Sequence, residues 1–269
     1  VDETPVASAS ISQVHRAVLR DGTQVALKIQ RPGIVDIIGT DLAILQSMAE
    51  QVEQVFPDAQ VYNPTGMVRD FSRQMQKELD FLQEAKTADR MRQNFAGVPG
   101  IRFPVMYREY STSRLLVMEY VEGVRIDDLH AIAAMGLDPR EIGRRGFHAY
   151  LRMIFEDGFF HGDPHPGNLL VTKDGTIVVL DFGIAGTLRP EKRQNFLSFL
   201  RAVTTGDTDL LIRSLEGFGV QIPGENRERL QDDLFILMQD LDLGSTISRF
   251  NFTMFANELA EVMRRYRIR

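Results

Sequence analysis

The chain has 269 residues, of which 43% are hydrophobic and 25% are charged, with a formal net charge of −6 at neutral pH. This composition supports a substantial core in one large domain or two lobes, and it argues against nucleic-acid binding, which needs a basic surface. Cysteine is absent, which excludes disulfides, thiolate metal sites and a cysteine nucleophile.

The N-terminal segment predicts a β-hairpin. ISQVHRAVL alternates, RDGT carries an Asp-Gly turn signal and QVALKIQ alternates again. RPG ends this pattern, and a long helix is expected over IIGTDLAILQSMAEQVEQVF. A second helix is expected from about Met67 to Asn94, and FPVMYREYSTSRLLVMEYVEG predicts two more strands.

From about Ile126 onward the pattern is mostly helical, with one hairpin inside it. Strands followed by helices predict an α+β fold of two lobes. We expect a small β-rich N-lobe with extra helices over residues 1–122 and a larger helical C-lobe over residues 123–269. No run of about 18 apolar residues occurs. We therefore expect a cytoplasmic protein, peripheral to a membrane only through segments that this chain lacks.

Lys28 interrupts an apolar strand, VALKIQ, where an isolated lysine would usually be solvated. In the expected helix from Met67 to Asn94, Glu78 falls inside an apolar stripe formed by Phe71, Met75, Leu82 and Ala85. A buried carboxylate is costly unless it is paired, so we expect Glu78 to pair with Lys28. The alternative is a Glu78 that reaches water at the lobe edge. On one continuous helix, Asp80 and Glu84 would point away from Lys28.

The stretch HGDPHPGN, from His161 to Asn168, predicts a rigid loop because its prolines and glycines exclude a helix. A zinc site is one interpretation, but His-x-x-x-His is informative only on a helix. We favour a structural role for His161, whose ring would hold the loop, and assign no role to His165. Asp163 is placed to orient or deprotonate an incoming hydroxyl group.

The following stretch, LLVTKDGTIVVLDFG, predicts a hairpin with Asp174-Gly175 as its two-residue loop. In that register Asn168 lies opposite Asp181, with Cβ atoms about 4.5–5.5 Å apart. An amide oxygen beside a carboxylate suits Mg²⁺, which takes a few protein oxygens plus substrate phosphates. An Asp-Gly hairpin alone does no chemistry, but the combined spacing with Asp163 favours a functional site.

These motifs resemble those of the UbiB (AarF/ADCK) family of atypical kinases, within the protein-kinase-like superfamily. The matching stretches are ASASISQVH, VALKIQRPG, ELDFLQEA, HGDPHPGN and LDFG, which spread from residue 7 to residue 183. The resemblance implies a two-lobed protein-kinase-like fold and an ATP- and Mg²⁺-dependent kinase or ATPase that supports isoprenoid-quinone (ubiquinone-type) lipid biosynthesis. Its partners would be the nucleotide and prenyl-lipid or quinone-biosynthesis enzymes.

The resemblance also implies residue roles. Asp163 would be the catalytic aspartate, Asn168 and Asp181 would hold Mg²⁺, and Lys28 would contact the α- and β-phosphates with Glu78 as its anchor. The remaining nucleotide contacts would come from an Ala-rich loop, its neighbouring strands and the hinge: Ala7, Ser8, Ala9, Ser10, Ile11, Ser12, Val14, Ala26, Met118, Glu119, Tyr120 and Val121.

Two other functions remain open. A small-molecule phosphotransferase of the aminoglycoside-kinase or choline-kinase type also uses an HGD…N loop, but the Ala-rich loop and KIQRPG favour the first reading. A non-catalytic nucleotide-binding regulator of lipid enzymes has no need of Asp163, Asn168 and Asp181 together. The Lys-x-Gly-Gln motif usual in the family is expected upstream of this chain.

Overall fold

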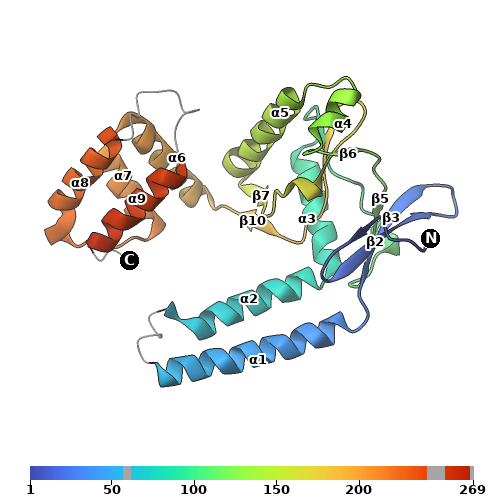
Figure 1. Ribbon diagram of the computed structural model, residues 1–269, viewed down its shortest axis with the longest axis horizontal. Coiled ribbons are helices and arrows are strands. Elements are labelled where there is room, and N and C mark those ends of the chain that lie inside the picture. Colours follow the sequence, from blue (N-terminus) through green and yellow to red (C-terminus); the bar gives the residue numbers. More distant parts are fainter. Residues whose placement is uncertain (57–61, 241–251, 267–269) are drawn as a thin grey trace. The chain divides into compact units, whose positions relative to one another are not determined.

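The computed structural model describes residues 1–56, 62–240 and 252–266. Within these ranges the chain forms two compact units, Val1–Gly186 and Thr187–Arg269 (Figure 1). Both helices and sheets are present in the first unit, so the α+β class is confirmed. The lobe boundary expected at residue 123 is a different division that lies inside the first unit, and it stays a prediction.

An antiparallel sheet opens the first unit. It comprises β1 (Ala7–Ser8), β2 (Ser12–Val18), β3 (Gln24–Gln30) and β5 (Leu115–Glu119), in the order β1-β2-β3-β5. The N-terminal hairpin is therefore confirmed as β2 and β3. Gly22 makes their turn with φ at 89°, a conformation that glycine adopts without steric cost.

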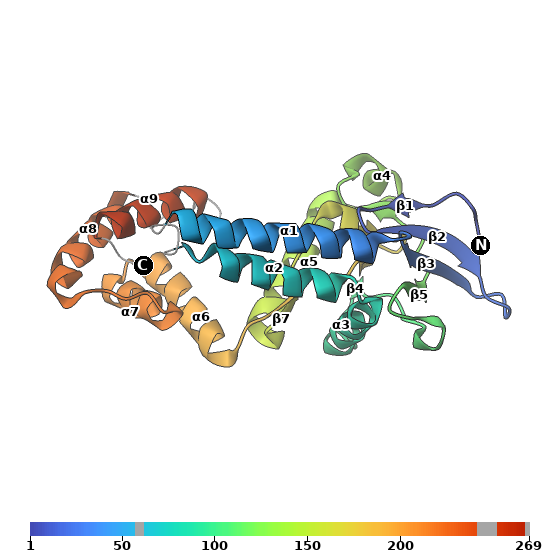
Figure 2. The ribbon, with the colours of Figure 1, turned by 90° about the horizontal axis from the view of Figure 1, so that it is seen from below.

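A pair of helices, α1 (Ile34–Val55) and α2 (Pro64–Glu78), follows strand β3, and the two lie side by side in Figure 2. The single helix expected from Met67 to Asn94 is wrong, because α2 ends at Glu78 and α3 (Phe81–Asn94) begins anew. Asp80 causes the break. Its backbone is extended and its carboxylate accepts from the Leu82 N–H at 3.1 Å, which is the geometry of a helix N-cap.

A second sheet has the order β4-β9-β8-β6, with β4 (Ile101–Arg102) parallel to β9 and the other neighbours antiparallel. Its remaining strands are β6 (Val124–Arg125), β8 (Leu169–Val171) and β9 (Ile177–Val179), while β7 (Phe159–His161) pairs with β10 (Ala185–Thr187). The helical elements near this sheet are α4 (Leu129–Ala134), α5 (Pro139–Arg152), a π-helical turn at Met153–Asp157 and a 3₁₀ turn at Pro166–Asn168, whereas the 3₁₀ turn at Arg108–Tyr110 lies beside β5 of the first sheet.

The register expected for the hairpin of β8 and β9 is wrong by one residue. Val171 faces Ile177, so the loop has three residues, 173–175, and Asn168 faces Leu180 rather than Asp181. The Leu180 N–H donates to the Asn168 carbonyl at 2.7 Å. Gly175, with φ at 79°, supplies the left-handed residue that a three-residue loop needs.

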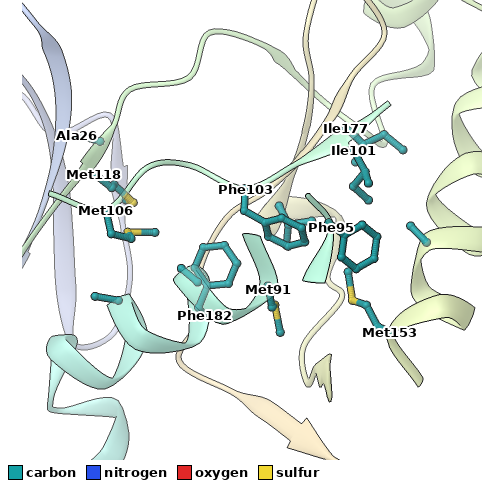
Figure 3. Packing of buried hydrophobic residues seen from close by; sticks show 14 of the residues in the cluster. Ala26, Met91, Phe95, Ile101, Phe103, Met106, Met118, Met153, Ile177 and Phe182 are labelled. Carbon is teal, nitrogen blue, oxygen red and sulfur yellow. The ribbon is translucent and has the colours of Figure 1, made fainter. Parts of the chain in front are cut away.

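A continuous core connects the two four-stranded sheets of the first unit through α3 (Figure 3). Phe103 lies at its centre, with its ring 5.3 Å from that of Phe95 and 6.0 Å from that of Phe182. Ala26 and Met118 join it from the first sheet. Since Phe182 follows Asp181 directly, packing of its ring holds the start of the LDFG turn.

The second unit is helical, as expected for the end of the chain. It contains α6 (Pro190–Thr205), α7 (Thr208–Phe218), a 3₁₀ turn (Gly224–Asn226), α8 (Arg227–Asp240) and α9 (Phe252–Arg265) around its own core, with Leu211, Leu234 and Phe255 fully buried. Among the described helices of both units, none combines the length and the apolar character that crossing a membrane requires.

The hairpin loop provides a first test. Gly175→Val should lower the free energy of unfolding by about 1–2 kcal/mol, because the left-handed conformation is costly for a β-branched residue. Gly175→Asn should cost less, since asparagine tolerates that conformation. Both variants add a Cβ at 3.2 Å from Leu137 Cδ2, so this contact is common to the two. Urea denaturation measures it, and equal losses would contradict the three-residue loop.

Candidate active site

Lys28 lies at the centre of a buried ion-pair network in the first unit. Its Nζ atom donates to both carboxylate oxygens of Glu84, at 2.8 and 2.9 Å, and lies 3.3 Å from Asp181 Oδ1. Lys28 is 7% exposed and Glu84 is 4% exposed. One ammonium group therefore connects strand β3, helix α3 and the LDFG turn.

The expected Lys28–Glu78 pair is wrong, and Glu84 takes the place of Glu78. The N-cap at Asp80 starts a new helix and resets the helical phase, so positions counted from α2 no longer apply on α3. The buried face of α3 is Phe81, Glu84, Ala85, Ala88 and Met91, a stripe at helical spacing. An Asp immediately before an apolar helical stripe is a helix-start signal, and it could have identified Glu84.

Lys28 and Asp181 keep their ionised forms, whereas burial raises the pKa of Glu84 despite the nearby Lys28 charge. Burial by itself would lower the pKa of Lys28, but the negative charges of Glu84 and Asp181 outweigh it and raise that pKa. Burial acts to raise the pKa of Asp181, yet the Lys28 ammonium and the Gly183 N–H lower it below its usual range. The site therefore holds a permanent cation directly beside an ionised carboxylate.

Glu78 nevertheless lies near the site, at the end of α2. A Cβ built on Gly183 would be 3.8 Å from Glu78 Cγ, which places the side chain against the LDFG turn. Burial raises the pKa of Glu78, and the nearby charge of Asp181 adds to this effect. Its position differs from that of Glu84, whose carboxylate accepts both of the hydrogen bonds that Lys28 donates.

His161 connects the HGDPHPGN loop to the LDFG turn, which confirms the structural role expected for it. The Asp163 N–H donates to His161 Nδ1 at 3.1 Å, so the ring proton lies on Nε2 and donates to the Asp181 carbonyl. Asp181 has φ at 56°, a left-handed conformation that is uncommon outside glycine. Lys28 holds its carboxylate and His161 holds its carbonyl, so this conformation is stabilised from both ends.

The loop residues between His161 and β8 hold one another. Asn168 Nδ2 is 3.4 Å from both the carbonyl oxygen and the Oδ2 atom of Asp163. The Gly167 N–H donates to His165 Nδ1 at 3.0 Å. Thus the structure brings Asn168 to Asp163 and Asp181 to Lys28. Within the described ranges, no three His, Asp or Glu side chains form a ready-made metal cluster.

The expected nucleotide-contacting residues lie around Lys28 on the first sheet. Val14 faces Lys28 from β2, and Ala26 faces Met118 across β3 and β5. Ala26 and Met118 are buried, while Val14 is half-buried. Ala7 and Ser8 form β1, Ser12 begins β2, and Ala9, Ser10 and Ile11 connect the two strands. The sheet thus brings together residues that are far apart in the sequence.

Two arginines that the sequence interpretation did not assign support this region. Arg31 donates to Ser8 Oγ at 2.7 Å and to the Ala9 carbonyl at 3.1 Å, so it holds the Ala-rich loop. Arg102 donates to Glu119 Oε1 at 2.7 Å and anchors the expected hinge, which continues through Tyr120 and Val121. Arg31 stands inside the quoted stretch VALKIQRPG, whereas no sequence signal pointed to Arg102.

Comparisons with known proteins agree with this arrangement. A family model described as "ABC1 atypical kinase-like domain" matches residues 1–215. The chain is 34% identical over 267 residues to Protein ACTIVITY OF BC1 COMPLEX KINASE 7, chloroplastic, of Arabidopsis thaliana, covering 89% of this chain and 38% of that protein. It is 32% identical over 268 residues to an uncharacterized protein in the hydrogenase 1 5' region of Clostridium pasteurianum, covering 100% of this chain and 50% of that protein.

A solved structure is also similar. It is the complex of Rv3197 from Mycobacterium tuberculosis with erythromycin, at 27% identity and a TM-score of 0.64, covering 88% of this chain and 61% of that one. The chain spans between 30% and 50% of the length of the curated relatives that it matches.

The Lys28–Glu84 pair can be tested by comparing two glutamates. Glu84→Gln should lower the free energy of unfolding by about 3–5 kcal/mol, because it leaves a buried charge short of its partner. The matched change Glu78→Gln should have little effect or stabilise the protein, since the Lys28 hydrogen bonds go to Glu84 and burial disfavours the Glu78 charge. Chemical denaturation compares the two, and an equal loss in Glu78→Gln would contradict the assignment.

A second prediction concerns acid. The pKa of Asp181 is lowered in the folded state, so its contribution to stability is present above the unfolded value of about 3.9 and is lost as the pH falls through the folded value. In metal-free protein, Asp181→Asn should make the fall in stability below about pH 4 shallower than in the wild type. Denaturation curves recorded across this range measure the slope, and parallel slopes would disprove the prediction.

Proposed function

This chain belongs to the ABC1 atypical kinase-like family, which confirms its protein-kinase-like fold class, and we propose that it binds ATP with Mg²⁺ and transfers or hydrolyses the γ-phosphate. One observation carries the proposal. Lys28 is held by a helix glutamate, Glu84, and lies beside Asp181 of the LDFG turn. Kinase-type phosphoryl transfer requires this lysine–glutamate pair and a metal-binding aspartate in one place.

The positive charge for the nucleotide comes from Lys28. Its raised pKa keeps it an ammonium group, and Glu84 fixes its position with two hydrogen bonds. In this proposal Lys28 contacts the α- and β-phosphates while the Ala-rich loop, held by Arg31, covers them. A lysine held in advance loses little side-chain entropy when the phosphates arrive.

The residues present fit Mg²⁺ by their donor chemistry. Asp181 offers a carboxylate that is ionised and fixed, and Asn168 offers an amide oxygen on the neighbouring loop. These few hard oxygen ligands are what Mg²⁺ takes from proteins in phosphate sites. When bound, the ion would neutralise charge on the phosphate oxygens.

Asp163 is proposed as the residue that orients or deprotonates the acceptor hydroxyl, or water. Its carboxylate is exposed, while its backbone N–H is fixed by His161 and its Oδ2 atom is near the Asn168 amide. A carboxylate that is reachable but fixed in direction suits general-base work.

The biological setting is proposed from the family resemblance alone. We place the activity in isoprenoid-quinone lipid biosynthesis, with quinone-biosynthesis enzymes as partners and a position in the cytoplasm at the periphery of a membrane. Two of the similar proteins carry the name ACTIVITY OF BC1 COMPLEX KINASE, which is said of those proteins.

Asp163→Asn separates binding from chemistry. The variant should keep the rise in unfolding temperature given by Mg²⁺ and ATP, because Asp163 lies outside the Lys28 network. Its phosphate release should fall at least about 100-fold, the contribution expected of a general base. Asp41→Asn, on the exposed surface of α1, is the matched control and should release phosphate at the wild-type rate.

Two results would replace the proposal. Nucleotide binding without phosphate release that depends on Asp163 would favour a non-catalytic regulator of lipid enzymes. Phosphorylation of a metabolite in a substrate screen would favour the small-molecule phosphotransferase.

A further inference from the structure

An apolar cavity of about 270 Å³ lies between helix α5 and the second sheet, entirely within the first unit. Its walls include one face of α5 (Gly143, Gly146, Phe147 and Tyr150) and the strand residues Ile177 and Val179. No Lys, Arg, Asp or Glu is among the residues that line it. The space opens to solvent along α5, where Gly143 and Phe147 are exposed, so it is a surface pocket of the kind that binds ligands and not a void in the core.

Two glycines in the interior of α5 border this space. Glycine is the least favourable helix residue after proline, so it usually serves close packing or a special backbone angle. Neither reason applies here. A Cβ on Gly143 would meet nothing within 4 Å among the described residues, and a Cβ on Gly146 would make only an ordinary contact at 3.5 Å with Ile177. Both positions have the α5 backbone conformation, without a positive φ. Gly143 is exposed and Gly146 is half-buried, and both leave the α5 side of the pocket without a side chain.

The size and lining of the cavity indicate the class of ligand. The accessible space of about 270 Å³ in this half-open pocket, with its almost wholly apolar lining, suits a molecule of about two fused rings. Charged ligands are disfavoured because no charged side chain could pair with them. One polar group is within reach: the Tyr150 hydroxyl donates to the His161 carbonyl at 3.2 Å and keeps its own lone pairs.

His161 and Pro164 of the catalytic loop also line this pocket. The His161 ring accepts the Asp163 N–H and donates to the Asp181 carbonyl, so it contacts both the cavity and the site. We propose that this cavity binds a small, uncharged, apolar molecule of about two fused rings. The bound molecule would contact the catalytic loop and reduce its motion. This inference goes beyond the phosphoryl-transfer function and does not depend on it.

The binding experiment uses 1-fluoronaphthalene as the probe, observed by fluorine NMR with the full chain and without nucleotide. Gly143→Leu places a side chain into the cavity, while Gly39→Leu in α1 is the matched control, because a Cβ there also meets nothing within 4 Å. We expect the wild type and Gly39→Leu to bind the probe alike, and Gly143→Leu to bind it at least tenfold more weakly.

Circular dichroism and the unfolding temperature show whether each variant is folded. A second variant, Gly146→Ala, fills only the volume of one methyl group and should weaken binding severalfold. Binding that is equal in all variants, or absent in the wild type, overturns the proposed site.

Hydrogen exchange tests the coupling to the loop. With the probe at saturation, the amide of Asp163 should exchange more slowly, and Gly143→Leu should lose this effect. Unchanged exchange in the wild type overturns the coupling. Neither measurement involves ATP, so failure here is distinct from failure of the proposed phosphoryl transfer.

Discussion

The ammonium group of Lys28, buried between the carboxylates of Glu84 and Asp181, is the interaction on which the site depends. A charge in this position is tolerated only because partners lie on both sides of it. The pairing fixes α3 against β3 and brings the LDFG turn to the same point. The Phe182 N–H also donates to Glu84 Oε1, so one carboxylate ties a helix to both a strand and a turn.

Both core packing and hydrogen bonds from the catalytic loop hold the LDFG turn beside this charged centre. Phe182 fixes the turn through packing against Phe103, while His161 fixes it through hydrogen bonds to Asp181 and Asp163. The left-handed backbone at Asp181 is therefore determined by its neighbours rather than by its own preference. This is the kind of strain that functional sites retain, because it aims a carboxylate in a direction that a relaxed turn would not give.

The sequence predicted the individual helices and strands better than the strand register and the contacts between them. The β2–β3 hairpin, the long helix α1 and the position of Lys28 on its strand follow from alternation and turn residues, which are local properties. Glu84 was missed because periodicity was carried across Asp80, where an N-cap carboxylate outcompetes continuation of the helix. The register of β8 and β9 was missed because Asp-Gly serves two-residue and three-residue loops alike, and the choice depends on which residue becomes left-handed. The proximity of Arg102 to Glu119 is tertiary, so no local pattern could show it.

Arg31 links the Ala-rich loop to the start of helix α1. It holds the loop from Ser8 to Ala9 with its side chain, and it lies three residues before the first residue of α1, Ile34. The paired helices α1 and α2 therefore begin next to the residue that holds the segment proposed to cover the nucleotide, so one arginine is shared by the attachment of both.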